Sequence, residues 1–315
     1  MPPDPAALSF RVLGCRLHAS GLTPQLARWL RASWDHPEHR TPDHGYVIDL
    51  ECLSAAPQPP DGEGEPSAVA LQDHTLRFVK TGSAWELREA GGGLRLDLGE
   101  RAARIRLWGV DEQPDPAVLY VGLQVVLSEA MRASGLMPLH AAVATRGDVA
   151  VAWLGTSGSG KSSTLLRAAR AGWRPVAEDL SWLEPESLRM WGWDRGVRVW
   201  PDTLARFFPE YADAPALPDG KRDIPYERLG AGPARSCTLS QLALLQRDEG
   251  AAISHRTGVE ARDTVRALWE ATGVPLSDAA RQASGRAIAR LSGLLPASRW
   301  VLGRQPPADV DGWFG

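Results

Sequence analysis

Apolar and polar residues alternate along much of the first third of the chain, a pattern that favours β-strands over helices. Every second side chain of a strand lies on the same face, so the alternation is typical of a sheet with one face in water. The predicted strands cover residues 10–13, 46–50, 75–79, 84–89, 94–98 and 103–108. Gly91-Gly92-Gly93 separates two of them with no helix after it, which predicts a hairpin turn rather than a phosphate loop.

Helices and buried strands share the rest of the chain. Helices are predicted for residues 23–32, 117–134, 163–171, 202–208, 263–271 and 276–295. Thr23 is a suitable N-cap for the first of these helices, and Gly135 ends the second. Short apolar runs predict buried strands at residues 138–144, 149–154, 174–180, 237–246 and 300–303.

Two segments with few apolar residues divide the chain. Residues 56–67 read APQPPDGEGEPS, a linker or exposed loop, and residues 111–116 read DEQPDP, a connector. We therefore predict an α/β fold with a β-rich N-terminal domain at residues 1–112. A second domain follows at residues 113–304, and residues 305–315 are a mobile tail.

One motif stands between an apolar strand and a helix. Gly155-Thr156-Ser157-Gly158-Ser159-Gly160-Lys161-Ser162 matches the phosphate-binding P-loop pattern G-x-x-x-x-G-K-[ST]. Its backbone N–H groups and those of the next residue, Ser163, would cradle the phosphates of a nucleotide at the helix N-terminus. Lys161 would reach the β- and γ-phosphates, and Ser162 would bind Mg²⁺. The alternative, a chance glycine turn before a helix, does not account for the complete match.

Composition narrows the choice of partners. The formal net charge of −3 predicts neither a nucleic-acid surface nor a membrane surface. The N-terminal residues do not resemble a signal peptide, and no apolar run is long enough to cross a bilayer. Cys15, Cys52 and Cys237 are far apart and form no C-x-x-C pair, which indicates reduced thiols in a cytoplasmic protein.

Three further residues are candidates for chemistry. Glu178 and Asp179 end the strand at 174–180, and a parallel neighbour of the P-loop strand would deliver both carboxylates to the phosphate end of the sheet. One could hold Mg²⁺ and the other could accept a proton from an attacking hydroxyl; two solvated loop charges are the alternative. His140 lies in an apolar strand and is either a core residue or part of the site.

These motifs together resemble a known family. Leu139-His140-Ala141-Ala142, the loop GTSGSGKS and the Glu178-Asp179 pair look like the catalytic domain of HPr kinase/phosphorylase and of the wider HPr-kinase-like group. The resemblance covers roughly residues 113–304, with its specific motifs at 140–179. It implies a P-loop domain of the HPr kinase/phosphoenolpyruvate carboxykinase type, with ATP and Mg²⁺ as cofactors.

The resemblance also implies roles for residues. His140, Lys161 and Asp179 fall at the family's active-site positions, with Asp179 as the proton acceptor, while Ser162 and Glu178 would bind the metal. Possible substrate or phosphate contacts are Arg195, Arg198, Lys221 and Arg222, with solvated surface charge as the alternative. The family's Glu-x-Arg-Gly-Leu-Gly-Ile segment is missing, which predicts that HPr is not the substrate.

The sequence thus predicts an ATP-dependent kinase that phosphorylates a hydroxyl of a peptide, a protein or a small molecule, with Asp179 as the base. Two alternatives stay open: a regulatory module that only binds nucleotide, and a plain NTPase with water as acceptor. The sequence leaves open the acceptor, the preference between ATP and GTP, and the oligomeric state.

Overall fold

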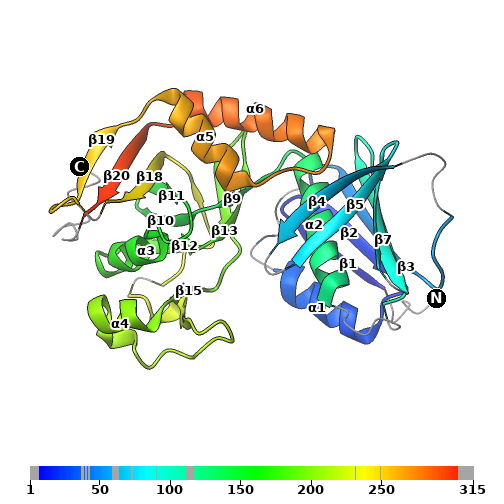
Figure 1. The fold of residues 1–315 in the computed structure, drawn as a ribbon, viewed down its shortest axis with the longest axis horizontal. Coiled ribbons are helices and arrows are strands. Elements are labelled where there is room, and N and C mark those ends of the chain that lie inside the picture. The colour runs from blue at the N-terminus through cyan, green and yellow to red at the C-terminus, as the bar shows by residue number, and fades with distance from the viewer. Residues whose placement is uncertain are drawn as a thin grey trace. The chain divides into compact units, whose positions relative to one another are not determined.

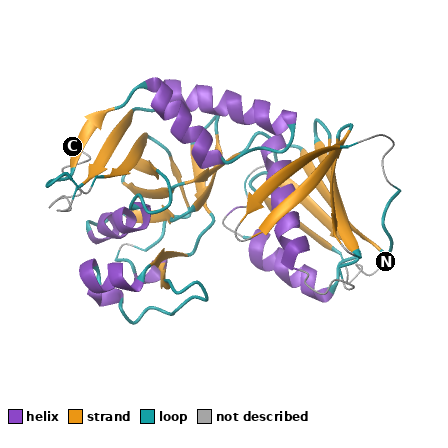
Figure 2. Ribbon diagram, viewed as in Figure 1, coloured by secondary structure: helices purple, strands orange, loops and turns teal. Residues whose placement is uncertain are grey.

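The computed structural model describes residues 7–36, 39, 41, 43–58, 64–71, 74–89, 91–110, 117–230, 232–248 and 250–303. The chain is a mixed α/β protein with large sheets (Figures 1 and 2). It divides into two compact units, the first made of Met1–Gly135 and Pro275–Ala280, the second of Leu136–Val274 and Arg281–Gly315. No helix in the described part of the chain is long and apolar enough to cross a membrane.

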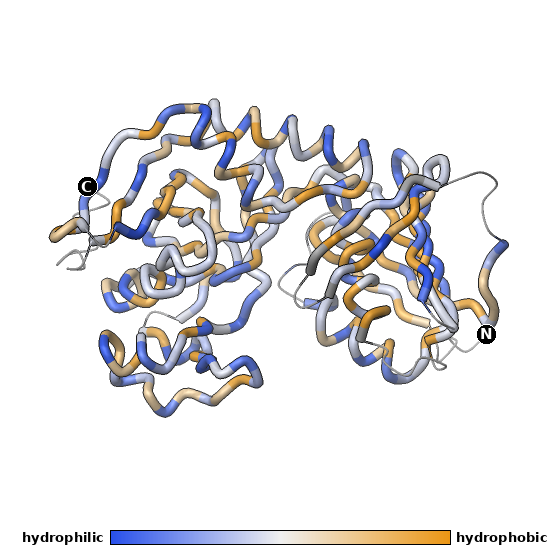
Figure 3. The backbone as a smooth tube through the Cα atoms, in the orientation of Figure 1, coloured by the Kyte–Doolittle hydropathy of each residue, from blue (hydrophilic) through white to orange (hydrophobic). Residues whose placement is uncertain are grey.

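The first unit contains an eight-stranded sheet of order β1-β2-β3-β8-β7-β6-β5-β4 among the described residues. Its strands are β1 (Leu8–Val12), β2 (Cys15–Ser20), β3 (Tyr46–Leu53), β4 (Glu65–Leu71), β5 (His74–Thr81), β6 (Ala84–Glu89), β7 (Gly92–Leu98) and β8 (Ala102–Trp108). The β2–β3 and β3–β8 pairs are parallel, and the others are antiparallel. Apolar stretches follow these strands in Figure 3.

Two helices accompany this sheet. Helix α1 (Pro24–Trp34) connects β2 to β3, and the Leu26 N–H donates to Thr23 Oγ1 at 3.2 Å, so the predicted N-cap is confirmed. Helix α2 (Ala117–Ala133) packs on β5, β7 and β8. The first unit therefore extends past the predicted boundary at residue 112, because the apolar face of α2 covers this sheet.

The second unit is built on a six-stranded sheet of order β12-β10-β11-β18-β20-β19 in the described residues. These strands are β10 (Ala142–Arg146), β11 (Val149–Leu154), β12 (Arg174–Ala177), β18 (Gln241–Arg247), β19 (His255–Gly258) and β20 (Ala297–Leu302). A second sheet, of order β17-β14-β13-β9, holds β9 (Met137–His140), β13 (Leu180–Glu184), β14 (Arg189–Gly192) and β17 (Ser236–Thr238). The short pair β15 (Gly196–Val199) and β16 (Arg222–Pro225) is separate.

Helices cover both faces of the six-stranded sheet. Along β11, Val151 and Trp153 belong to one buried cluster, and Ala152 and Leu154 belong to the other. The first cluster includes residues of α3 (Lys161–Arg170) and α4 (Pro201–Phe207). The second includes residues of α5 (Ala261–Thr272) and α6 (Asp278–Leu294). Burial on both faces explains why β11 reads as a continuous apolar run rather than an alternating one.

Several predictions differ from the structure. The single strand predicted at 138–144 is wrong, because β9 and β10 belong to different sheets. The single strand predicted at 237–246 is wrong, because β17 and β18 belong to different sheets and buried Leu239 lies between them. A turn at Leu13 and Gly14, both with positive φ, adds the unpredicted strand β2. The predicted linker at 56–67 ends inside β4, its residues 59–63 lie outside the described part, and so does the predicted tail 305–315.

Candidate functional site

The glycine loop, residues 155–160, connects β11 to α3. Gly158 and Gly160 have φ of +80° and +101°, a left-handed conformation that side chains with a Cβ adopt only at a cost. Gly160 is the N-cap of α3, and a Cβ there would also meet Leu302 Cδ1 at 2.6 Å. The first N–H groups of α3 have no helical acceptor and carry the positive end of the helix dipole, so the loop can bind an anion.

Lys161 folds back across this loop. Its Nζ donates to the carbonyl of Gly155 at 2.7 Å and to that of Thr156 at 3.4 Å. The residue is 7% exposed, and burial lowers its pKa, opposed by Asp179 and Glu178. The Oγ of Ser159 is buried in the same loop and has no hydrogen-bond partner among the described residues. An ammonium and a free hydroxyl therefore line the loop where an anion would sit.

Glu178 reaches the start of α3 from the loop after β12. Its Oε1 accepts a hydrogen bond from Ser162 Oγ at 2.5 Å, and the residue is 6% exposed. Burial raises the pKa of Glu178 to about 7, although the Ser162 hydrogen bond opposes the shift. These two oxygen atoms are of the donor type that Mg²⁺ prefers, and the remaining ligands would come from phosphate or water.

Strand β12, which ends directly before Glu178, is not the neighbour of β11 that the sequence predicted. Strand β10 lies between β12 and β11 and is antiparallel to both. Strands β11 and β12 therefore run in the same direction, and the carboxyl ends of both strands lie at the same edge of the sheet. The prediction of an adjacent parallel strand is wrong, but Glu178 still arrives beside Ser162.

Asp179 contacts His140 and also acts electrostatically on Lys161 of the glycine loop. His140 Nε2 lies 3.1 Å from Asp179 Oδ1, and the two side chains are 48% and 38% exposed. Burial lowers the pKa of His140, an effect that the negative charge of Asp179 opposes. With a half-exposed side chain at the end of β9, His140 is not a core residue.

Asp194 holds the acidic loop in place. Its Oδ2 accepts the N–H groups of Glu178, Asp179 and Leu180 at 3.2, 2.8 and 2.8 Å. Burial raises the pKa of Asp194, and the donors at Leu180 and Asp179 oppose the rise. Sequence reasoning missed this role, because the carboxylate belongs to the loop after β14 and no local pattern connects it to the residues it holds.

Arg198 on β15, one of the four cations that the sequence suggested for the site, lies beside Glu178 and Asp194. Its Nε lies 3.8 Å from Glu178 Oε2, and its Nη2 lies 3.5 Å from Asp194 Oδ1. The side chain of Arg195 is exposed. Lys221 contacts Asp219 at 3.7 Å and Arg222 donates to the Ala214 carbonyl at 3.0 Å, so their described contacts are elsewhere.

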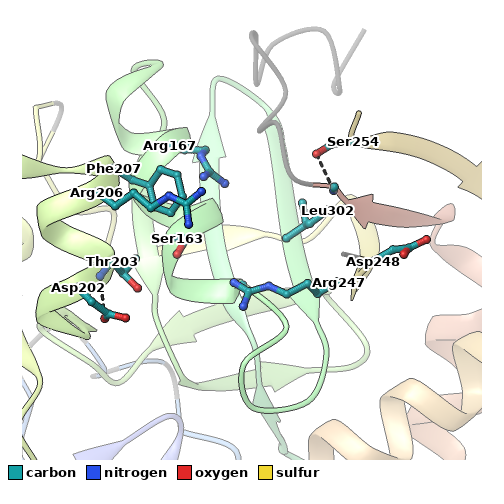
Figure 4. Close-up of a pocket in the computed structure, with 12 residues that line it drawn as sticks. Ser163, Arg167, Asp202, Thr203, Arg206, Phe207, Arg247, Asp248, Ser254 and Leu302 are labelled. Atoms are coloured by element: carbon teal, nitrogen blue, oxygen red, sulfur yellow. Dashed lines mark hydrogen bonds between the residues drawn. The ribbon is translucent and has the colours of Figure 1, made fainter. Parts of the chain in front are cut away.

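Two cavities border the glycine loop. One, of about 610 Å³, is lined by His140, Gly155, Thr156, Ser157 and residues of α5. The other, of about 600 Å³, is lined by Gly160, Ser163 and residues of α3, α4 and β18 (Figure 4). The loop therefore separates a space on the His140 side from a space on the Ser163 side.

Searches against models of known protein families and against curated proteins find no match for this chain. No group of three or more His, Cys, Asp or Glu side chains in the described ranges is placed to hold a metal ion. The site is therefore defined by its own geometry: a glycine loop, a buried lysine and two carboxylates in different surroundings.

Proposed function

We propose that this protein is an ATP-dependent phosphotransferase of the HPr-kinase-like type, with a P-loop domain related to phosphoenolpyruvate carboxykinase. It transfers the γ-phosphoryl group to a hydroxyl of a peptide, a protein or a small molecule. The observation that carries the proposal is the partly exposed Asp179 carboxylate 3.1 Å from His140, next in the chain to a Glu178 that contacts Ser162.

The glycine loop binds the nucleotide in this proposal. Its N–H groups and the N-terminus of α3 surround the phosphate oxygens, and Lys161 exchanges its two carbonyl contacts for the β- and γ-phosphates. Ser162 and Glu178 would hold Mg²⁺, which when bound neutralises charge on the triphosphate. Burial raises the pKa of Glu178 to about 7, and the charge of a bound Mg²⁺ would favour its ionised form.

The acceptor enters from the His140 side. Its hydroxyl oxygen attacks the γ-phosphorus, the bond from that phosphorus to the β–γ bridging oxygen breaks, and ADP leaves. The hydroxyl proton passes to a carboxylate oxygen of Asp179. His140 donates to the other lone pairs of that carboxylate and orients it. The cavity of about 610 Å³ beside His140 has room for a small molecule or a peptide segment.

Removal of the loop cation tests the nucleotide half of the proposal. Lys161→Ala should weaken binding of ATP-Mg by at least about tenfold and abolish turnover, because a charge-assisted contact to phosphate is lost. Lys80→Ala removes a lysine of the first unit and is the matched control. Calorimetry measures binding, and label from γ-labelled ATP measures transfer into candidate acceptors in a lysate.

The assay with γ-labelled ATP also distinguishes the kinase from the two alternatives, an NTPase and a regulatory module. Label in one protein or small molecule supports the kinase, and release of labelled phosphate without any acceptor identifies an NTPase. ATP binding without turnover identifies a regulatory module. Unchanged affinity in Lys161→Ala would refute the assignment of the glycine loop.

A further inference from the structure

The cavity on the Ser163 side of the glycine loop is lined by three arginines from separate elements. Arg167 comes from α3, Arg206 from α4 and Arg247 from the end of β18. In Figure 4, Arg167 and Arg206 lie beside Phe207, and Arg247 extends from the opposite wall. The cavity volume is about 600 Å³, which is within the usual range of small-molecule sites.

These arginines have no ion pair within the described residues. The guanidinium groups of Arg167 and Arg206 instead lie 5.5 and 4.9 Å from the centre of the Phe207 ring. The two carboxylates in the lining, Asp202 and Asp248, accept the backbone N–H groups of Thr203 and Gly250, each at 2.8 Å. Positive charge in the cavity is therefore not balanced by ion pairs.

Arg167 and Arg247 also repel each other. Burial lowers the pKa of Arg167, and the positive charges of Arg170 and Arg247 lower it further. Arg170 is balanced by Glu210, which it contacts through both carboxylate oxygens, whereas Arg167 and Arg247 have no such partner among the described residues. An anion bound between Arg167 and Arg247 would relieve this repulsion.

Helix geometry connects this cavity to the glycine loop. Ser163 and Arg167 are four residues apart on α3 and share one face of the helix, and both line the cavity. Ser162 points to another face and contacts Glu178. Adjacent residues of α3 thus serve two places: Ser163 lines the arginine cavity and Ser162 contacts Glu178.

We propose that this cavity is a binding site for a phosphate group, held by Arg167, Arg206 and Arg247. Arginine suits this ligand, since its planar donors match phosphate oxygens in pairs. The phosphate belongs either to the nucleotide on the glycine loop, as its α-phosphate, or to a second phosphate-bearing molecule. The first of these sources rests on the proposed nucleotide binding, the second does not, and neither needs phosphoryl transfer to occur.

The test uses the double variant Arg206→Ala/Arg247→Ala. Both side chains are exposed, so their loss leaves the buried core intact. Arg11→Ala/Arg28→Ala removes the same charge from exposed positions of the first unit and is the control. Each protein is saturated with a non-hydrolysable ATP analogue and Mg²⁺, which fills the glycine loop, and is then titrated with inorganic phosphate in a calorimeter.

Two results support the site. In the first, phosphate binds the loaded wild type, and its affinity falls by at least about tenfold in the double variant but not in the control. This result identifies a second phosphate-bearing molecule as the ligand. In the second, the loaded wild type binds no phosphate, and the affinity for the ATP analogue itself falls by about tenfold in the double variant. This result identifies the α-phosphate of the nucleotide as the ligand. If the variant matches the control for both ligands, the proposal is overturned. If the analogue does not bind, phosphate is titrated alone, and the same comparison decides independently of the kinase proposal.

Discussion

Glu178 and Asp179 are consecutive in the chain but face different surroundings. Glu178 is 6% exposed and contacts Ser162, whereas the Asp179 side chain is 38% exposed and contacts His140. Asp194 fixes this difference, since it accepts the backbone N–H groups of both residues. Two carboxylates in unlike environments can take two roles, which under our proposal are metal binding and proton acceptance.

Asp179→Asn tests the second role. Asparagine keeps the size and most hydrogen bonds of the side chain but cannot accept the hydroxyl proton. Phosphoryl transfer should fall by about two to four powers of ten, and ATP affinity should hold or rise because a negative charge is removed. Transfer rate and ATP affinity are measured in parallel over a range of Mg²⁺ concentrations.

Glu178→Gln is the companion variant for that experiment. Because Glu178 is proposed to bind the metal, excess Mg²⁺ should partly restore the transfer rate of Glu178→Gln. No concentration of Mg²⁺ should restore the transfer rate of Asp179→Asn. Wild-type transfer by Asp179→Asn would eliminate the proposed base.

The pKa of Glu178 predicts a pH dependence of stability. The folded protein holds this proton more tightly than the unfolded chain, because the pKa rises from 4.5 to about 7 on folding. The resulting stability is complete below the unfolded pKa and is lost as pH rises through about 7. Glu178→Gln has no such proton to lose, so it should become more stable than wild type above neutral pH, by an amount on the order of a few kcal/mol.

Urea denaturation without nucleotide or Mg²⁺, at pH 5.5 and pH 8, measures the free energy of unfolding of both proteins. The stability difference between variant and wild type should grow from the lower to the higher pH. A difference that is the same at both values would mean that Glu178 is ionised throughout.

At the scale of single residues, the sequence predicted site residues only where they belong to a recognisable motif. Lys161 and Ser162 were chosen from the P-loop motif, and His140, Glu178 and Asp179 from their place in predicted strands and from the family resemblance. The structure brings these residues together in two contacting pairs and one lysine that spans the loop. Asp194 and the three arginines of the cavity were not recognised as parts of a site. They act through neighbours far away in the chain, and such contacts leave no periodicity.

At the scale of elements, helices were predicted more faithfully than strand order. The apolar stripes of α1, α2, α5 and α6 are local signals, and each helix lies within a few residues of its prediction. The position of β10 between β11 and β12 depends on pairing between distant segments, which local alternation does not encode. The division of 237–246 into β17 and β18 has the same cause, since an apolar run does not indicate a change of sheet.

The turn between β12 and β13 depends on one side chain from another loop. Asp194→Ala should remove the acceptor of three N–H groups and destabilise the protein by about 1–3 kcal/mol, because part of this backbone is buried. It should also weaken binding of ATP-Mg, since Glu178 loses its fixed position. Asp219→Ala, which removes an exposed acceptor of the Lys221 N–H at 3.1 Å, is the control and should cost less than about 0.5 kcal/mol.

Chemical denaturation and calorimetric titration with ATP-Mg measure these two effects. Equal stability losses in Asp194→Ala and Asp219→Ala would show that the acidic loop keeps its shape without Asp194.

At the scale of the whole molecule, the chain forms two units and the first one includes a distant segment. Pro275–Ala280 belongs to the first unit, between two stretches of the second. The sequence predicts two domains but places the boundary at residue 112, because the connector at 111–116 is the visible break in composition. Helix α2 joins the first unit by packing on β5, β7 and β8, and residues 275–280 join it through a contact across more than a hundred residues. Composition reports neither contact.

Two contacts hold this segment in the first unit, one buried and one exposed. The Ser277 N–H donates to Glu129 Oε1 at 2.5 Å, and Glu129 is 3% exposed. Lys80 Nζ lies 3.0 Å from Asp278 Oδ2, and those side chains are 29% and 63% exposed. A buried donor that loses its acceptor keeps its full desolvation cost, whereas an exposed ion pair is replaced by water.

Glu129→Ala should therefore lower the free energy of unfolding by about 1–3 kcal/mol, and Lys80→Ala by at most about 1 kcal/mol. Hydrogen exchange localises the effect: in Glu129→Ala, protection should fall in residues 275–280 and in α2. ATP-Mg affinity should stay at the wild-type value in both variants, since the glycine loop, Lys161 and Glu178 belong to the second unit. Equal losses in the two variants would mean that the buried contact with Ser277 does not anchor the segment, and its position would then have to depend on apolar packing, which Leu276→Ala would reveal.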